Sequence, residues 1–127
     1  MKNRKLMLVC LSTLIIAMLL SACNSAKFDV QNTTNIEIKN GTTGEILAIN
    51  EEAQIQAMVR MFSENEFEKK ESSKNQTGWN YRITFYQDEK VLEEIAVMSN
   101  GRVSYGGNFY EKDGAVDLDY FDELFRG

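Results

Sequence analysis

The chain has 127 residues, 14 basic against 19 acidic side chains, two cysteines and no histidine. This length suits one small domain. Without histidine, Ser-His-Asp and Cys-His nucleophilic sites are excluded, and the commonest ligand of zinc and copper is missing. The acidic balance argues against nucleic acid as a partner, because lysine and arginine supply most of the affinity for phosphates.

The N-terminus carries the pattern of a secretory signal peptide. Lys2, Arg4 and Lys5 precede a largely apolar run from Leu6 to Leu20. A run of about 15 residues is shorter than the roughly 20 that a membrane-spanning helix needs. The basic residues would stay on the cytoplasmic side, so the rest of the chain is expected to be exported.

The apolar run ends in Leu20-Ser21-Ala22-Cys23, an aliphatic residue and two small residues before a cysteine. This ending resembles the lipobox of bacterial lipoproteins. The resemblance implies cleavage between Ala22 and Cys23, diacylglycerol on the Cys23 sulfur, and often a fatty acid such as palmitate on the new amino group. Two or three acyl chains would anchor the protein stably, since each buried CH₂ adds about 0.8 kcal/mol. The alternative is an ordinary signal peptide in which Cys23 stands by chance.

Cleavage would remove residues 1–22 as a signal peptide and leave an acidic mature chain. Of the basic residues 11 would remain, against all 19 acidic ones, giving a net charge of −8. Such a domain should be repelled by anionic lipid. Cys10 would leave with the signal peptide and Cys23 would carry lipid, so no disulfide could form within the chain.

The mature chain is expected to begin with a tether and continue as one domain. Residues 23–35 are the lipidated N-terminus and tether, in which Phe28 and Val30 could contact the domain or start a strand. A dozen extended residues reach about 40 Å at most, so the domain, residues 36–127, should stay close to the membrane.

The first half of the domain predicts a β-hairpin and a helix. Residues 36–39 and 45–49 are short apolar-rich runs on either side of an Asn-Gly turn. Asn50 stands at the position of an N-cap, which predicts a helix over residues 51–65. Its apolar face has the spacing i, i+3, i+4 and i+7, with Ile55, Met58, Val59 and Phe62.

The second half predicts further strands and a last helix. Residues 66–76 are charged and predict a loop, with a short strand around residues 67–70 as an alternative. Alternating apolar residues and tight turns predict strands over residues 79–86, 91–98, 102–105 and 108–111. Asp117 predicts an N-cap for a short helix whose apolar face is Leu118, Phe121, Leu124 and Phe125.

The predicted fold class is therefore α+β, in the order ββ-α-ββββ-α. The connections between strands are short, which favours antiparallel pairing over parallel crossovers. We expect an antiparallel sheet of about five or six strands, with the main helix packed on one face and a short C-terminal helix.

Carboxylates are the most abundant groups with chemical potential. Their densest cluster lacks the spacing of an EF-hand loop, and a turn, a cap and the polar side of a helix explain it: Asp113, Asp117, Asp119, Asp122 and Glu123. Ser72, Ser73 and Lys74 could form a Ser-Lys arrangement, but their surroundings are typical of a solvated loop. We predict no catalytic residue, no metal and no cofactor.

Four aromatic residues are candidates for a binding surface. Tyr86, which alternates with core residues of its strand, is the best candidate for an exposed aromatic side chain. Trp79 is more readily explained as core, whereas Tyr105 and Tyr110, which flank the Gly106-Gly107 turn, fit either interpretation.

The mature domain also resembles small domains of unassigned activity found behind lipoboxes in low-GC Gram-positive bacteria. The resemblance lies in Thr77-Gly78-Trp79, Asn108-Phe109-Tyr110 and Val116-Asp117-Leu118, and it implies no activity. The sequence favours a non-enzymatic module that binds a protein or envelope component at the outer face of the cell membrane. The alternatives are an immunity-type lipoprotein that sequesters a cationic peptide or toxin, and a small envelope hydrolase that uses carboxylates.

Overall fold

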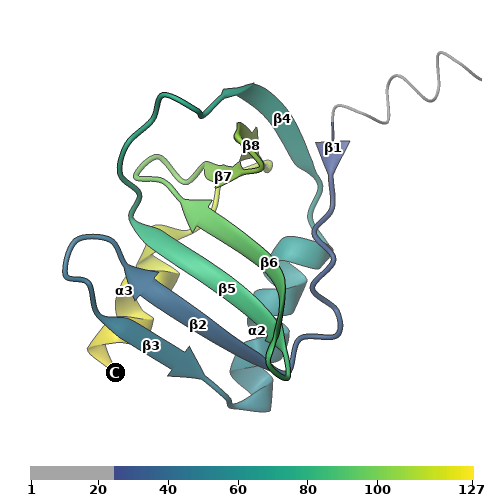
Figure 1. The fold of residues 1–127 in the computed structure, drawn as a ribbon, viewed down its shortest axis with the longest axis vertical. Coiled ribbons are helices and arrows are strands. Elements are labelled where there is room, and N and C mark those ends of the chain that lie inside the picture. The colour runs from purple at the N-terminus through teal and green to yellow at the C-terminus, as the bar shows by residue number, and fades with distance from the viewer. Residues whose placement is uncertain (1–24) are drawn as a thin grey trace, which may run out of the picture.

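A computed structural model describes residues 25–127 (Figure 1). The predicted signal peptide, its cleavage site and Cys23 lie outside these residues. The elements follow in the order β1 (Ser25–Ala26), β2 (Asn35–Asn40), β3 (Ile46–Ile49), α2 (Glu52–Ser63), β4 (Phe67–Ser72), β5 (Tyr81–Gln87), β6 (Lys90–Val97), β7 (Val103–Tyr105), β8 (Asn108–Glu111) and α3 (Leu118–Arg126). None of the described helices is long and apolar enough to cross a membrane.

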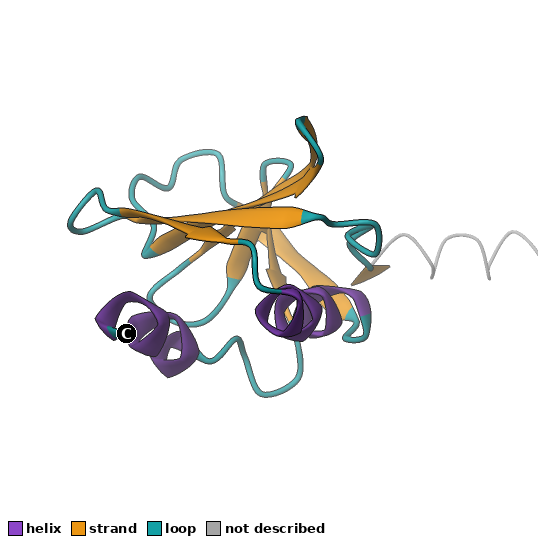
Figure 2. Cartoon of the chain, turned by 90° about the horizontal axis from the view of Figure 1, so that it is seen from below, coloured by secondary structure: helices purple, strands orange, loops and turns teal. Residues whose placement is uncertain are grey.

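The strands form one antiparallel sheet in the order β1-β4-β8-β7-β6-β5-β2-β3. The α+β class and the antiparallel pairing are therefore confirmed. The helix α2 carries the chain across the sheet, because it connects the edge strand β3 with β4 near the opposite edge. Both helices cover the same face of the sheet and leave the other face open (Figure 2).

The strands β1 and β4 differ from the sequence prediction. Residues 66–76, predicted mainly as a loop, contain the six-residue strand β4, which pairs with β8 and with the short strand β1. The alternation in β4 buries only Phe67, and a bulge between Lys69 and Ser72 interrupts its register. A strand that is solvated along most of its length has no apolar period, which explains why the sequence predicts a loop there.

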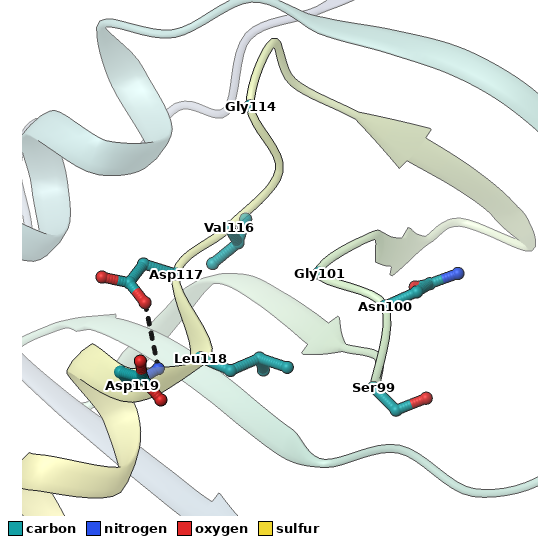
Figure 3. Close-up of a pocket in the computed structure, with 8 residues that line it drawn as sticks. All are labelled: Ser99, Asn100, Gly101, Gly114, Val116, Asp117, Leu118 and Asp119. Atoms are coloured by element: carbon teal, nitrogen blue, oxygen red, sulfur yellow. Dashed lines mark hydrogen bonds between the residues drawn. The ribbon is translucent and has the colours of Figure 1, made fainter.

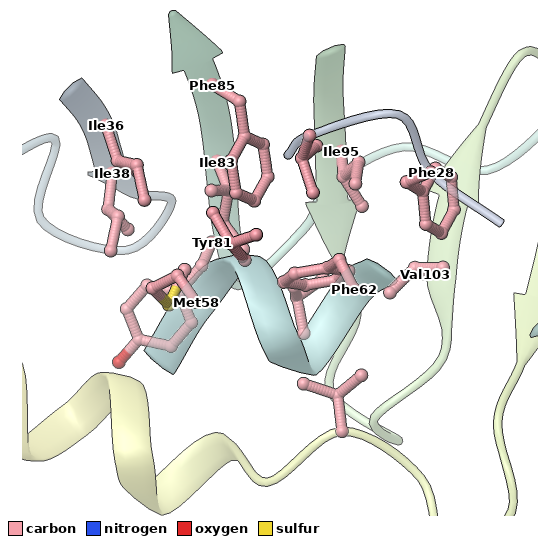
Figure 4. Close-up of a cluster of buried hydrophobic side chains, with 14 of the residues drawn as sticks. Phe28, Ile36, Ile38, Met58, Phe62, Tyr81, Ile83, Phe85, Ile95 and Val103 are labelled. Atoms are coloured by element: carbon pink, nitrogen blue, oxygen red, sulfur yellow. The ribbon is translucent and has the colours of Figure 1, made fainter. Parts of the chain in front are cut away.

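The core lies between the sheet and the two helices (Figure 4). Alternate residues of the central strands point toward the helices, as the sequence predicts for Tyr81, Ile83 and Phe85. The predicted face of the first helix is buried, namely Ile55, Met58, Val59 and Phe62. In α3, Phe121 is fully buried, and Leu118, Leu124 and Phe125 pack against the core.

The two helix starts differ from each other. Asp117 caps α3 as predicted, since its carboxylate accepts a hydrogen bond from the Asp119 amide at 3.1 Å. The prediction of Asn50 as the cap of the first helix is wrong: Glu51 occupies the cap position of α2 without a side-chain hydrogen bond, and the helix begins at Glu52. Burial of one apolar face is enough to fix α2 without a cap.

The segment before β2 belongs to the same core. Phe28 and Val30 are buried, at 3% and 0% exposure. Thr33 closes a local turn by donating to the Val30 carbonyl at 2.5 Å, and the Thr34 amide donates to the Tyr86 carbonyl at 2.8 Å. The packed residues 28–34 therefore link β1 at one edge of the sheet to the start of β2.

Candidate functional site

The open face of the sheet carries the most exposed apolar side chains of the described chain. Ile46 on β3 is 59% exposed and Val91 on β6 is 50% exposed. Both lie on the open face, because Ile46 is opposite Lys39 in the register and Val91 is opposite Tyr86. Tyr86 itself is half-buried there, on the face that the alternation predicts.

Trp79 is also on this side of the sheet and not in the core, so its predicted core position is wrong. β5 begins only at Tyr81, so strand alternation does not orient the preceding side chain. The indole is half-buried, and the guanidinium of Arg82 lies 4.4 Å from its ring centroid. Arg82 in turn pairs with Glu94 of β6 at 3.3 Å. The result is a partly exposed cation–π stack at one end of the open face.

The turn between β2 and β3 supports this indole. A Cβ on Gly41 would lie 2.0 Å from the Trp79 carbonyl oxygen and 2.9 Å from the indole Cε3. The Gly41 amide also donates to the carbonyl of Asn80 at 2.7 Å. Close approach of the two backbones therefore requires glycine at this position.

Tyr105 and Tyr110 do not join Tyr86 or Trp79. Both are half-buried on the helix side, where their rings surround Phe28 at centroid distances of 5.1 and 6.3 Å. Hydrogen bonding to Glu93 and burial raise the pKa of the Tyr105 hydroxyl. The four predicted aromatic residues thus lie on two surfaces, and the structure does not assemble them into one site.

A shallow groove lies between the β6–β7 turn and the start of α3 (Figure 3). Its volume is about 390 Å³, and it is lined by Ser99, Asn100, Gly101, Gly114, Val116, Asp117, Leu118 and Asp119. The side chains of Ser99 and Asn100 point to the opposite side from Asp117. Leu118 extends between them, so the groove does not bring its polar side chains together.

Two residues of the predicted acidic cluster have structural roles. Asp117 caps α3, and Asp122 accepts a hydrogen bond from the Tyr81 hydroxyl. Burial and this hydrogen bond raise the pKa of Tyr81 to about 12. Within residues 25–127, no group of three or more acidic or cysteine side chains could hold a metal ion.

Ser72, Ser73 and Lys74 lie where β4 meets the β7–β8 turn. Ser73 is buried, and its hydroxyl accepts a hydrogen bond from Ser104 at 2.8 Å. The Ser72 hydroxyl donates to the Gly107 carbonyl at 3.3 Å. The two serine hydroxyls therefore hold the sheet together at this point.

An arginine that the sequence does not distinguish is the centre of an ion-pair network. Arg102 pairs with Glu71 of β4 and, at 3.4 Å, with Glu111 of β8, and it lies 5.9 Å from the ring of Phe109. Its hydrogen bond to Glu71 raises the pKa of the guanidinium. Arg102 and Glu111 face each other across the β7–β8 hairpin, whereas Glu71 reaches Arg102 because β4 pairs with β8, a pairing that the sequence pattern does not predict.

Comparison of the chain with protein-family models, with curated protein sequences and with solved structures gave no match.

Proposed function

We propose that the chain is a bacterial lipoprotein, held by lipid on Cys23 at the outer face of the cell membrane. The observation that carries the proposal is Leu20-Ser21-Ala22-Cys23 directly after an apolar run with a basic start. The position of the first packed residues agrees with it. Ser25 pairs with β4, so the paired part of the domain begins two positions after Cys23 and would lie close to the lipid.

The domain itself we propose to be a non-enzymatic binding module for a protein or an envelope component. The absence of histidine from the whole sequence removes the commonest general base, and the hydroxyls of Ser72 and Ser73 form hydrogen bonds within the domain. The open face is the surface to test first, because exposed Ile46 and Val91 lie there with Tyr86 and the Trp79–Arg82 stack. Aromatic and arginine side chains of this kind are enriched in protein interfaces.

Lipidation is tested by expression of the full-length chain in a Gram-positive host. Mass spectrometry of the N-terminal peptide should find diacylglycerol on Cys23, and the protein should sediment with membranes. The Cys23→Ala variant should lose the lipid and the membrane association. An unmodified cysteine, with the wild-type protein released into the medium, would disprove the proposal.

The binding role is tested with a photo-crosslinking residue at Val91 on the open face, in cells that carry the anchored protein. Gln56, exposed on the far side of α2, provides the matched control position. A crosslink to one component from position 91, absent from position 56 and weaker without the anchor, is the expected result. Equal crosslinking from both positions would contradict a role for the open face.

A second function is favoured by charge. The proposed mature chain has a net charge of −8, and residues 111–123 hold six acidic residues and one lysine. An acidic domain attracts cationic ligands and raises their association rate in a salt-dependent way. A lipoprotein that sequesters a cationic peptide or toxin would therefore protect its host. Equal sensitivity of deletion and parent strains to a panel of cationic peptides would count against this role.

A further inference from the structure

The N-terminal segment is fixed to one edge of the domain. In β1, Ser25 pairs with Glu68 and Ala26 pairs with Phe67, at the outer side of β4. Two residues further on, the ring of Phe28 is 5.1 Å from Phe67, 6.0 Å from Phe62 of α2 and 5.1 Å from Tyr105. Strand pairing and the buried aromatic ring together hold the start of the domain in place.

From this position we infer that the β1–β4 edge of the sheet faces the membrane and that β3 and α3 face away from it. The inference rests on the proposed lipidation of Cys23. Two extended residues span at most about 7 Å, so the lipid would be attached close to Ser25. A tether that was free as far as residue 35 would reach about 40 Å and would leave the domain free to turn.

The order of the strands shows which elements lie opposite β1. β1 and β3 are the two edge strands of the sheet. Figure 1 shows β1 at one side of the domain and β3, α3 and the C-terminus at the other. An anchor beside β1 therefore directs the β2–β3 hairpin and α3 away from the lipid.

The charge distribution favours the same orientation. Because β1 is antiparallel to β4, with Ser25 opposite Glu68, the N-terminal end of β1 points toward Lys69 and Lys70. Residues 66–74 hold three lysines and three glutamates and are neutral, whereas α3 with its cap, residues 117–126, holds four acidic residues and one arginine and has a net charge of −3. An anionic membrane repels the acidic part and not the neutral edge, so the domain is stable with β4 near the lipid.

The orientation can be measured with single-cysteine variants of the full lipidated protein. Its two native cysteines would be lost with the signal peptide or blocked by lipid, so an added cysteine is the one free thiol. Lys69→Cys reports on the β4 edge and Thr43→Cys, in the exposed β2–β3 turn, on the far side. Each is labelled with a fluorophore and placed in vesicles of phosphatidylethanolamine and phosphatidylglycerol that contain a nitroxide-headgroup lipid.

The expected result is loss of most of the fluorescence at residue 69 and little loss at residue 43. Insertion of a ten-residue Gly-Ser linker between Asn24 and Ser25 leaves the packed residues unchanged and should reduce the quenching at residue 69. Equal quenching at both positions in the lipidated protein would overturn the orientation alone. Mass spectrometry of the same sample gives the second readout, since absence of lipid on Cys23 would overturn the proposed function together with the orientation.

Discussion

The hydroxyl of Tyr81 donates a hydrogen bond to the carboxylate of Asp122, which joins the central strand β5 to α3. The ring of Tyr81 also stacks on Phe121 at 5.3 Å and on Phe125 at 5.6 Å between centroids. One polar and two aromatic contacts therefore attach the C-terminal helix to the sheet, and several properties of the protein should depend on them.

Removal of the hydroxyl separates the polar contact from the aromatic ones. Tyr81→Phe keeps the ring in place and should lower the free energy of unfolding by about 1.5 kcal/mol, because a partly buried hydrogen bond to a carboxylate is lost. Urea denaturation of residues 24–127 measures the difference. Tyr86→Phe on the open face is the control and should stay within about 0.5 kcal/mol of wild type. Equal effects of the two substitutions would show that the bond to Asp122 contributes nothing.

The same hydroxyl predicts a loss of stability at alkaline pH. Its pKa is raised to about 12 in the folded protein, mainly by burial, and an unfolded tyrosine ionises near pH 10. The folded state therefore favours the neutral phenol, and this stabilisation is complete below about pH 10 and decreases up to about pH 12. Wild type should lose more stability than Tyr81→Phe between pH 8 and pH 11. Parallel pH profiles of the two proteins would contradict the assignment to Tyr81.

Burial of the N-terminal segment predicts that a substitution before residue 36, the predicted domain start, strongly lowers stability. Phe28→Ala should lower the free energy of unfolding by about 3–4 kcal/mol. It removes a ring that is 3% exposed and contacts four other aromatic rings. Phe125→Ala, at a half-buried position of α3, should lower the free energy of unfolding by less. Thermal unfolding of both variants gives the comparison. A Phe28→Ala protein as stable as wild type would show that residues 28–34 do not belong to the core.

The contact between Gly41 and Trp79 predicts intolerance of even one methyl group. Gly41→Ala should lower the free energy of unfolding by about 1–3 kcal/mol, because the added Cβ would overlap the Trp79 carbonyl oxygen. Thr42→Ala in the same exposed turn should change stability by about 0.5 kcal/mol or less. The midpoint of urea denaturation compares the stability of the two variants. A Gly41→Ala protein as stable as wild type would mean that the turn moves freely away from the indole.

The sequence predicts the elements that have an apolar face and misses those that do not. Helix α2 and strand β5 repeat their buried residues at regular spacing, so their type and orientation follow from the pattern. β4 buries Phe67 alone, and its partners are set by the crossover through α2, which no local signal specifies. The two-residue strand β1 is too short to give any pattern.

Periodicity likewise predicts only part of the candidate surface on the open face. Tyr86 is on the open face because it follows the alternation of β5, whereas Trp79 precedes the strand and is placed by the β2–β3 turn instead. The contact of Arg102 with Glu71 likewise depends on the pairing of β4 with β8. Pairings between distant segments thus decide which polar residues meet, and they are invisible to periodicity.

The ring of Phe28 has a consequence for the order of events during export. It is among the first described residues of the chain, yet its contacts include Tyr105 and Tyr110, which are close to the C-terminus. A core that needs both ends of the chain cannot close until nearly all of it has crossed the membrane, and such long-range pairing is slow. The proposed export pathway would therefore receive an open chain, and the domain would reach its final position beside the lipid only after translocation is complete.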